Sequence, residues 1–245
     1  MSDAPRWIRT PEDMGRLAGT LARARAVSID TEADSLHHYP GKLCLVQIAT
    51  DVGEGHLVDP LLLADLSALG PCLADPGIVK VLHAADNDLA YLKRLHAFTV
   101  ASLFDTALAA RFLGVAALGL DELLKSFIGV DPGKSRQKDD WSRRPLTAEQ
   151  ETYALNDVLH LNALRDRLTE DLRVNGRLSW LEEECAALAA LALGLDPGFF
   201  FPQRLIDRLA ADPPADAEVL AHTEGVRRWR AEVGGPELLQ VLRTA

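Results

Sequence analysis

The order of strand-like and helix-like segments constrains the fold of this 245-residue chain more than any other feature. Three strand-like runs follow one another in the first quarter of the chain, and later strands alternate with helices. Antiparallel neighbours can be joined by tight turns, whereas parallel strands need a crossover, usually a helix. The order therefore predicts an α/β domain with a mixed sheet and helices packed on it.

The individual elements follow from apolar spacing and from the residues that start and stop helices. Short, mostly apolar runs predict strands over residues 27–32, 43–49, 56–60, 78–83 and 100–104. Helical spacing predicts helices over residues 10–24, 61–74, 86–96, 106–113 and 120–128. A loop follows over residues 130–146, and the capping-box pattern from Thr147 to Gln150 then begins a long helix that runs to about Leu172.

The C-terminal part reads as a separate helical region. We assign residues 1–175 to the α/β domain and residues 176–245 to this region, which is punctuated at Asp196-Pro197-Gly198 and at Asp212-Pro213-Pro214. The length of the chain suits one domain of common size with a smaller helical appendage.

The composition is that of a folded globular protein, with 48% hydrophobic and 25% charged residues. Its apolar runs are too short to span a bilayer, and its first residues lack the pattern of a signal peptide. The three cysteines show no C-x-x-C spacing, which favours a reducing compartment. We therefore expect a cytoplasmic protein without a membrane partner.

Acidic side chains outnumber basic ones, 36 Asp and Glu against 26 Lys and Arg, which gives a formal net charge of −10. Domains built mainly as a basic surface for nucleic acid carry the opposite excess. The charge argues against that class and raises the question of what particular acids do.

Asp30 and Glu32 stand two residues apart in the strand predicted over residues 27–32. Side chains alternate along a strand, so both carboxylates share the face opposite Val27 and Ile29. Taken alone, the pair fits an edge strand with a solvated acidic face. On an interior strand the two carboxylates would need a cation between them.

Further acids follow later in the chain. Asp86 and Asp88 open the helix predicted over residues 86–96, where helix capping alone would explain one acid. Asp157 follows Tyr153 by four residues, so both lie on one helix face, and alone it reads as an ordinary surface acid.

Together these acids can converge at one end of the sheet. Four carboxylates there would hold two divalent cations, Mg²⁺ or Mn²⁺, because all the ligands are hard oxygens. Two such cations serve phosphodiester hydrolysis, and a tyrosine on the same helix face would orient the attacking water.

Three segments resemble the three exonuclease motifs of the DEDD superfamily: Asp30-Thr31-Glu32, residues 83–89 and residues 153–157. The Tyr-x-x-x-Asp form of the third segment is that of the tyrosine subgroup. Residues 39–49 and 140–146 resemble the corresponding segments of ribonuclease D. The resemblance covers roughly residues 5–185.

This resemblance implies a ribonuclease-H-like mixed sheet flanked by helices. It implies that the metal ligands are Asp30, Glu32, Asp88 and Asp157, and that Tyr153 orients the water. Asp86 matches no motif acid. The implied activity is 3′→5′ hydrolysis, most readily of single-stranded RNA 3′ ends, with release of nucleoside 5′-monophosphates. A DNA-directed exonuclease for repair or proofreading, and a non-catalytic RNA-binding adaptor, stay open.

Candidate substrate-binding residues surround these motifs. They are Thr31, Tyr39, His83, Lys138, Trp141, Arg143 and Arg144. Basic side chains with an interleaved aromatic in the loop over 130–146 suit single-strand binding. The alternatives are a solvated loop with one anchoring tryptophan, a packing role for Tyr39 and a backbone-bonded His83.

The C-terminal region departs from the family pattern. Long-form ribonuclease D carries two helical HRDC modules after the exonuclease domain, whereas residues 199–245 resemble at most part of one. Accessory modules help to choose substrates, so tRNA precursors, short oligonucleotides and DNA all stay open.

Overall fold

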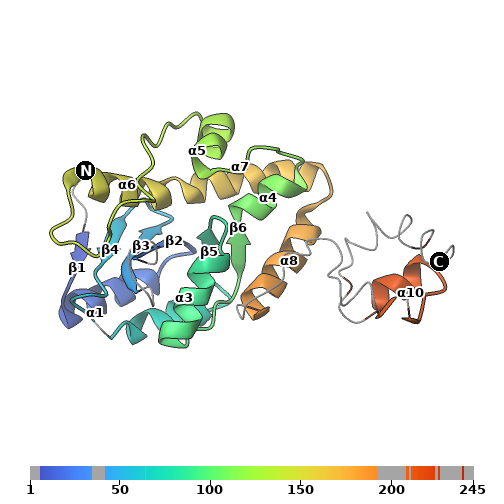
Figure 1. The fold of residues 1–245 in the computed structure, drawn as a ribbon, viewed down its shortest axis with the longest axis horizontal. Helices are drawn as coiled ribbons and strands as arrows, with labels where there is room; N and C mark the ends of the chain where they lie inside the picture. Colours follow the sequence, from blue (N-terminus) through green and yellow to red (C-terminus); the bar gives the residue numbers. More distant parts are fainter. Residues whose placement is uncertain are drawn as a thin grey trace.

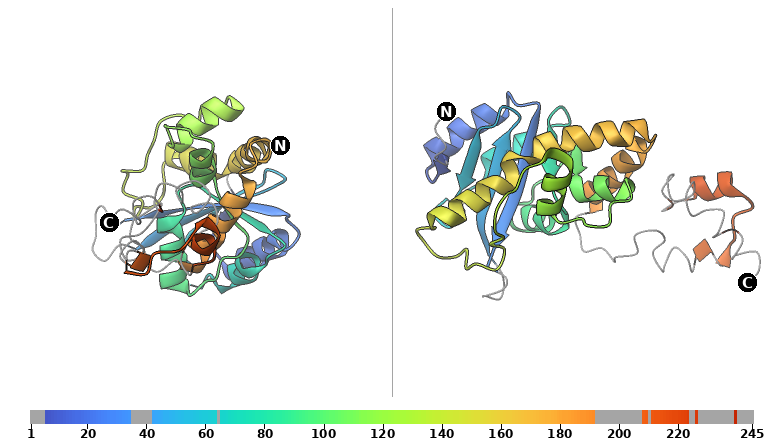
Figure 2. Two further views of the ribbon diagram at one scale, coloured as in Figure 1. Left: turned by 90° about the vertical axis from the view of Figure 1, so that its right-hand side faces the viewer. Right: turned by 90° about the horizontal axis from the view of Figure 1, so that it is seen from above.

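The computed structural model describes residues 6–34, 42–63, 65–191, 208–209, 211–223, 226 and 239. A six-stranded sheet with the order β1-β4-β3-β2-β5-β6 forms its centre. Helices cover both faces of this sheet, so the domain has three layers (Figures 1 and 2). The predicted α/β class and the mixed sheet are confirmed.

The strands pair in both directions. They are β1 (Arg6–Ile8), β2 (Ala26–Ala33), β3 (Leu43–Thr50), β4 (Gly55–Val58), β5 (Val79–Leu82) and β6 (Leu103–Asp105). The β2–β3 and β3–β4 pairs are antiparallel, and the β2–β5, β5–β6 and β1–β4 pairs are parallel. Strand β2 is thus interior, which rules out the edge-strand explanation of its two acids. Strand β1 was not predicted.

One face of the sheet is covered by the helices from the first half of the chain (Figure 2). They are α1 (Pro11–Leu21), the short turn η1 (Ser67–Leu69), α2 (Gly70–Ala74) and α3 (Asp86–His96). The helix predicted over residues 61–74 is wrong in length. The carboxylates of Asp59 and Asp65 accept the backbone N–H groups of Leu61 and Ser67 and form turns instead.

The opposite face carries helices from the second half of the chain, among them the helix that contains Asp157. In chain order the helices of the second half are α4 (Thr106–Phe112), α5 (Leu120–Leu123), the π-helical turn η2 (Leu124–Ile128), α6 (Ala148–Leu159) and α7 (Leu161–Val174). The predicted capping box at Thr147 and Gln150 is present. The predicted single helix breaks at His160, which lets α6 cover β2, β3 and β4 while α7 covers β2 and β5.

The helix α8 (Leu178–Leu191) lies beyond the predicted domain boundary at residue 175 but packs into the main core. Leu181 and Cys185 are buried there, and the Cys185 sulfur accepts the backbone N–H of Asp105. Farther on, α10 (Ala217–His222) contributes to a small separate apolar cluster. An HRDC-like role of this region stays a prediction. Among the described residues, none of the helices is long and apolar enough to cross a membrane.

Candidate active site

A cleft of about 680 Å³ opens at one end of the sheet, between β2, the start of α3, the loop over residues 132–137 and α6. All five predicted catalytic residues line it: Asp30, Glu32, Asp88, Tyr153 and Asp157. Motifs that are far apart in the sequence therefore meet in one cleft.

Strand β2 supplies two of the acids from a single face. Val27 and Ile29 point into the core on the other side, as the alternation predicts. The pairing register of β2 and β3 shifts directly after Glu32, so the regular ladder ends beside the cleft. Oxygens of Asp30, Glu32 and Asp157 all lie within 4.8 Å of one another. Three hard oxygen donors at this spacing can share one divalent cation.

Asp88 joins the group through Thr31. The Thr31 hydroxyl donates a hydrogen bond to the Asp88 carboxylate, with an O···O distance of 2.5 Å. Thr31, predicted as a substrate contact, therefore orients an acid in this structure. Asp86, two residues earlier, is exposed and does not line the cleft, in line with its lack of a motif role.

Burial in the cleft shifts all four acids toward the protonated form. It raises the pKa of Glu32 to about 9 and the pKa of Asp88 and of Asp157 to about 7. The pKa of Asp30 is raised well above its usual range by burial and by the neighbouring carboxylates. Among the described residues that line the cleft there is no lysine or arginine. A divalent cation is the charge that such a donor set fits.

Tyr153 stands beside Asp157, one turn earlier on α6. Its hydroxyl is hydrogen-bonded to the Asp157 carboxylate, and burial raises the pKa of the phenol. The phenol therefore stays protonated at neutral pH and acts as a hydrogen-bonding group rather than as a base.

The turn that leads from β5 to Asp88 is held by Asp105, a residue that the sequence did not single out. Its carboxylate accepts the backbone N–H groups of Ala84 and Ala85 at 3.2 and 2.8 Å. Ala84 has a φ of 52°, a left-handed conformation that such hydrogen bonds stabilise. Asp105 also caps α4 by accepting from Ala107 and Leu108. The sequence signal that could have identified Asp105 is an aspartate at the end of a strand, directly before a helix.

His83 lines the cleft, and its Nδ1 lies 2.9 Å from the Thr106 hydroxyl. Burial lowers the pKa of His83, so its ring is neutral at pH 7. A contact between His83 and substrate stays a prediction. Tyr39 lies outside the described residues.

The structure contradicts the predicted substrate contact of Trp141, which lies in the loop before α6. Trp141 is fully buried and packs against Tyr153, with ring centroids 6.1 Å apart, so it cannot stack on a base. Trp141 belongs to the apolar cluster between α6 and β3. Arg143 is exposed and pairs with Asp140. Lys138 is exposed but does not line the cleft, whereas its neighbours Ser135 and Gln137 do.

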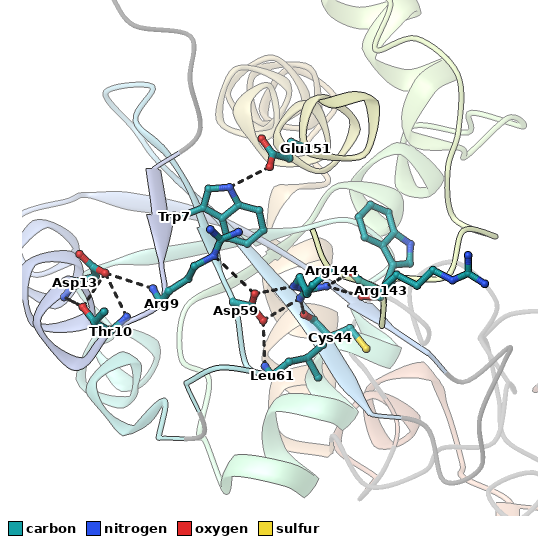
Figure 3. A network of polar contacts seen from close by, with 11 residues as sticks. Trp7, Arg9, Thr10, Asp13, Cys44, Asp59, Leu61, Arg143, Arg144 and Glu151 are labelled. Atoms are coloured by element: carbon teal, nitrogen blue, oxygen red, sulfur yellow. Dashed lines mark hydrogen bonds and ion pairs between the residues drawn. The ribbon is translucent and has the colours of Figure 1, made fainter. Parts of the chain in front are cut away.

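Arg144 points toward Asp59 and Cys44 (Figure 3), and it does not line the cleft. Its guanidinium binds both oxygens of the fully buried Asp59 carboxylate at 2.7 and 2.9 Å and the Cys44 carbonyl at 2.6 Å. It also donates to the carbonyls of Trp141 and Arg143 within its own loop. Arg144 therefore ties the loop to β3 and to the end of β4, directly before α6 begins.

Two more contacts seat α6 on the sheet. The Trp7 indole N–H donates to Glu151 at 3.1 Å (Figure 3). A Cβ at Gly55 would lie 2.9 Å from a Leu155 methyl carbon, so a larger residue would require the Leu155 side chain to shift where α6 packs on β4. The position of Tyr153 and Asp157 follows from this seating.

Comparison with known proteins agrees with this geometry. The chain matches a family model described as 3′-5′ exonuclease over residues 5–173. It is 34% identical to ribonuclease D of Gluconacetobacter diazotrophicus, over 98% of this chain and 72% of that protein. It is 39% identical to protein RRP6-like 3 of Arabidopsis thaliana over 71% of this chain, but it spans only 19% of that protein. It likewise spans 48% of the ribonuclease D of Desulfotalea psychrophila, at 37% identity.

Solved structures show the same fold. Escherichia coli RNase D aligns with a TM-score of 0.72 at 24% identity, over 98% of this chain and 75% of that one. Brucella melitensis NrnC, in a structure described as bound to pGG, aligns with a TM-score of 0.64 at 28% identity, over 69% of this chain and 84% of that one.

Proposed function

Because the chain belongs to the 3′-5′ exonuclease family, and within it to the ribonuclease D group, we propose that it hydrolyses RNA from the 3′ end in a reaction that needs divalent cations. The products are nucleoside 5′-monophosphates. One observation carries the proposal: the convergence of Asp30, Glu32 and Asp157 within 4.8 Å in a cleft that has no basic side chain among its described lining residues.

Asp30, Glu32 and Asp157 would hold one cation, and Asp88 would supply a ligand to a second. We assign Mg²⁺ or Mn²⁺, since both prefer carboxylate oxygens. A Brucella melitensis NrnC structure described as having bound Mg²⁺ supports the assignment. When bound, such cations neutralise the carboxylates, lower the pKa of a coordinated water and stabilise the leaving oxygen.

Tyr153 orients the nucleophilic water. Its hydroxyl is fixed by Asp157 and stays protonated, so it can hold the water by a hydrogen bond without removing its proton. The acids and Tyr153 come from rigid elements on both sides of the cleft, which keeps the reacting groups in register.

Single-stranded RNA 3′ ends are the proposed substrates, since the relatives are ribonucleases and a related nuclease holds pGG. The candidate substrates are precursors of tRNA and short oligonucleotides. The proposed location of the protein is the cytoplasm. Lys138 and Arg143 remain candidates for backbone contacts, because both are exposed on the loop beside the cleft.

A digestion time course tests this function. The substrates are 5′-labelled single-stranded RNA, duplex RNA, a tRNA precursor and DNA, each with Mg²⁺, Mn²⁺ or EDTA. We expect stepwise shortening of RNA from its 3′ end only when a divalent cation is present, and none with Asp30→Asn. Preferential shortening of DNA would favour a repair or proofreading exonuclease. No release of nucleotide under any condition would favour an RNA-binding adaptor.

A further inference from the structure

A buried glutamine lies beside the acid cluster, on the neighbouring strand. Gln47 of β3 is fully buried and pairs in register with Asp30 of β2. Directly opposed residues of antiparallel strands share one face of the sheet, with Cβ atoms about 4.5–5.5 Å apart. The Gln47 amide is therefore within one side-chain length of the Asp30 carboxylate.

The surroundings of Gln47 on β3 and β4 are apolar. Its neighbours there are Leu45, Ala49 and Leu57, all buried, whereas β2 presents Asp30 directly opposite and Ser28 and Glu32 diagonally on the same face. Within the described part of the chain, neither the oxygen nor the nitrogen of the Gln47 amide has a hydrogen-bond partner. Buried amides in folded proteins are almost always hydrogen-bonded, so a polar side chain here needs a function. Asp30 is the polar group opposite it.

We infer that Gln47 is a positioning residue for Asp30. When a cation holds one Asp30 oxygen, the Gln47 N–H donates to the carboxylate, directly or through one water, and fixes its orientation. Such partners of metal ligands tune affinity without touching the metal. The inference rests on the proposed metal site of the preceding section.

The variant Gln47→Met tests it, because Met has a similar length and no amide. Calorimetric titration of the full chain with MnCl₂ should show an affinity about 10–100-fold weaker than wild type. The melting temperature of the metal-free variant should equal or exceed that of wild type, because an unpartnered buried amide is replaced by an apolar group. A mere packing role predicts the opposite: lower stability with unchanged affinity.

His56 offers a matched control. It is also buried in the sheet with both ring nitrogens unpartnered among the described residues, but it opposes Ile48 and so faces the other side of the sheet. His56→Leu should leave the affinity for Mn²⁺ unchanged. A loss equal to that of Gln47→Met would show a general effect of sheet repacking and would overturn the inference.

The outcomes separate the two proposals. If wild type fails to bind Mn²⁺, or binds no better than Asp157→Asn, the metal site itself is refuted. If wild type binds and Gln47→Met binds equally well, only the role of Gln47 is refuted. Should Gln47→Met not fold, Gln47→Asn keeps the amide but shortens its reach by one methylene. Its affinity should then fall, and wild-type affinity would overturn the inference.

Discussion

At the scale of single residues, Asp157 shows that an acid placed to bind a metal lowers the stability of the metal-free protein. It is buried beside two other carboxylates, and burial raises its pKa to about 7. Keeping it ionised without a cation costs folding free energy, which the protein accepts in order to hold the metal.

Asp157→Asn should therefore separate the two properties. At pH 8 and without metal, the variant should melt about 2–4 °C higher than wild type, the shift expected for roughly 1 kcal/mol in a protein of this size. Hydrolysis should be lost because a metal ligand is missing. Scanning calorimetry in EDTA and the RNA time course measure the two effects, and a lower melting temperature would contradict the first.

Tyr153→Phe should affect the rate and spare the metal. The Phe ring keeps the packing against Trp141, while the hydroxyl that orients water is lost. We expect the single-turnover rate to fall about 10–100-fold, with Mn²⁺ affinity close to that of wild type. Equal losses in both measurements would assign the hydroxyl to metal binding instead.

The motif acids could be read from the sequence because their spacing on a strand or helix decides which face they share. Trp141 and Arg144 could not, since a loop has no periodicity that tells inward from outward side chains. Their partners, Tyr153 and Asp59, lie on other elements, and only the folded chain shows these contacts.

At the scale of elements, α6 is the helix that completes the cleft, because it carries Tyr153 and Asp157. Arg144 pairs with Asp59, whose side chain is 0% exposed, whereas the adjacent Arg143 pairs with Asp140 while its own side chain is 83% exposed. A buried pair loses far more when one partner is removed than an exposed pair does.

Arg144→Ala should therefore cost about 3 kcal/mol of unfolding free energy, because the buried Asp59 carboxylate loses its two-bond partner and keeps only Arg9 at 3.9 Å and the Leu61 N–H. Arg143→Ala should cost about 1 kcal/mol or less. Urea denaturation of both variants measures the difference. Similar values for the two arginines would contradict the assigned role of Arg144 in seating the loop.

Most element positions followed from apolar periodicity, and the exceptions have local causes. Strand β1 has three residues, too few to show alternation. The leucine-rich segment after β4 is divided by turns at Asp59 and Asp65. The helix predicted from Thr147 to Leu172 divides into α6 and α7, which cover different strands of the sheet. Periodicity reports which face is buried, but not where competing turns or sheet twist end an element.

At the scale of the whole molecule, the cleft acids predict an unusual dependence of stability on pH. Their pKa values are raised in the folded state, so above pH 6.5 the folded state binds more protons than the unfolded state. Stability must then fall as pH rises. The shifted histidines have lowered pKa values, so they act in the opposite direction up to about pH 7.5, above which they have lost their protons in the unfolded state as well.

The melting temperature in EDTA should therefore decrease from about pH 7.5 upward, and the slope should become smaller near pH 9, where Glu32 loses its proton in the folded state as well. Bound Mn²⁺ favours the ionised carboxylates, so the decrease should be smaller or reversed with the metal present. Melting curves at both conditions check this. A parallel decrease with and without metal would show that the cleft acids are not the cause.

The net charge of −10 gave a misleading first impression of this molecule. Four of the acids meet in the cleft, where cations would cancel much of their charge. The total charge of a chain does not tell which acids are gathered in one place, and that arrangement only emerges from the fold.

The acids of the cleft come from β2, α3 and α6, and Thr31 and Asp88 alone are 57 residues apart in the chain. A cation held by these segments would act as a reversible cross-link that closes long loops, as a disulfide does in other proteins. Divalent ions would then set the lifetime of the folded chain as well as its catalytic rate. Withdrawing them would shorten the lifetime and stop catalysis.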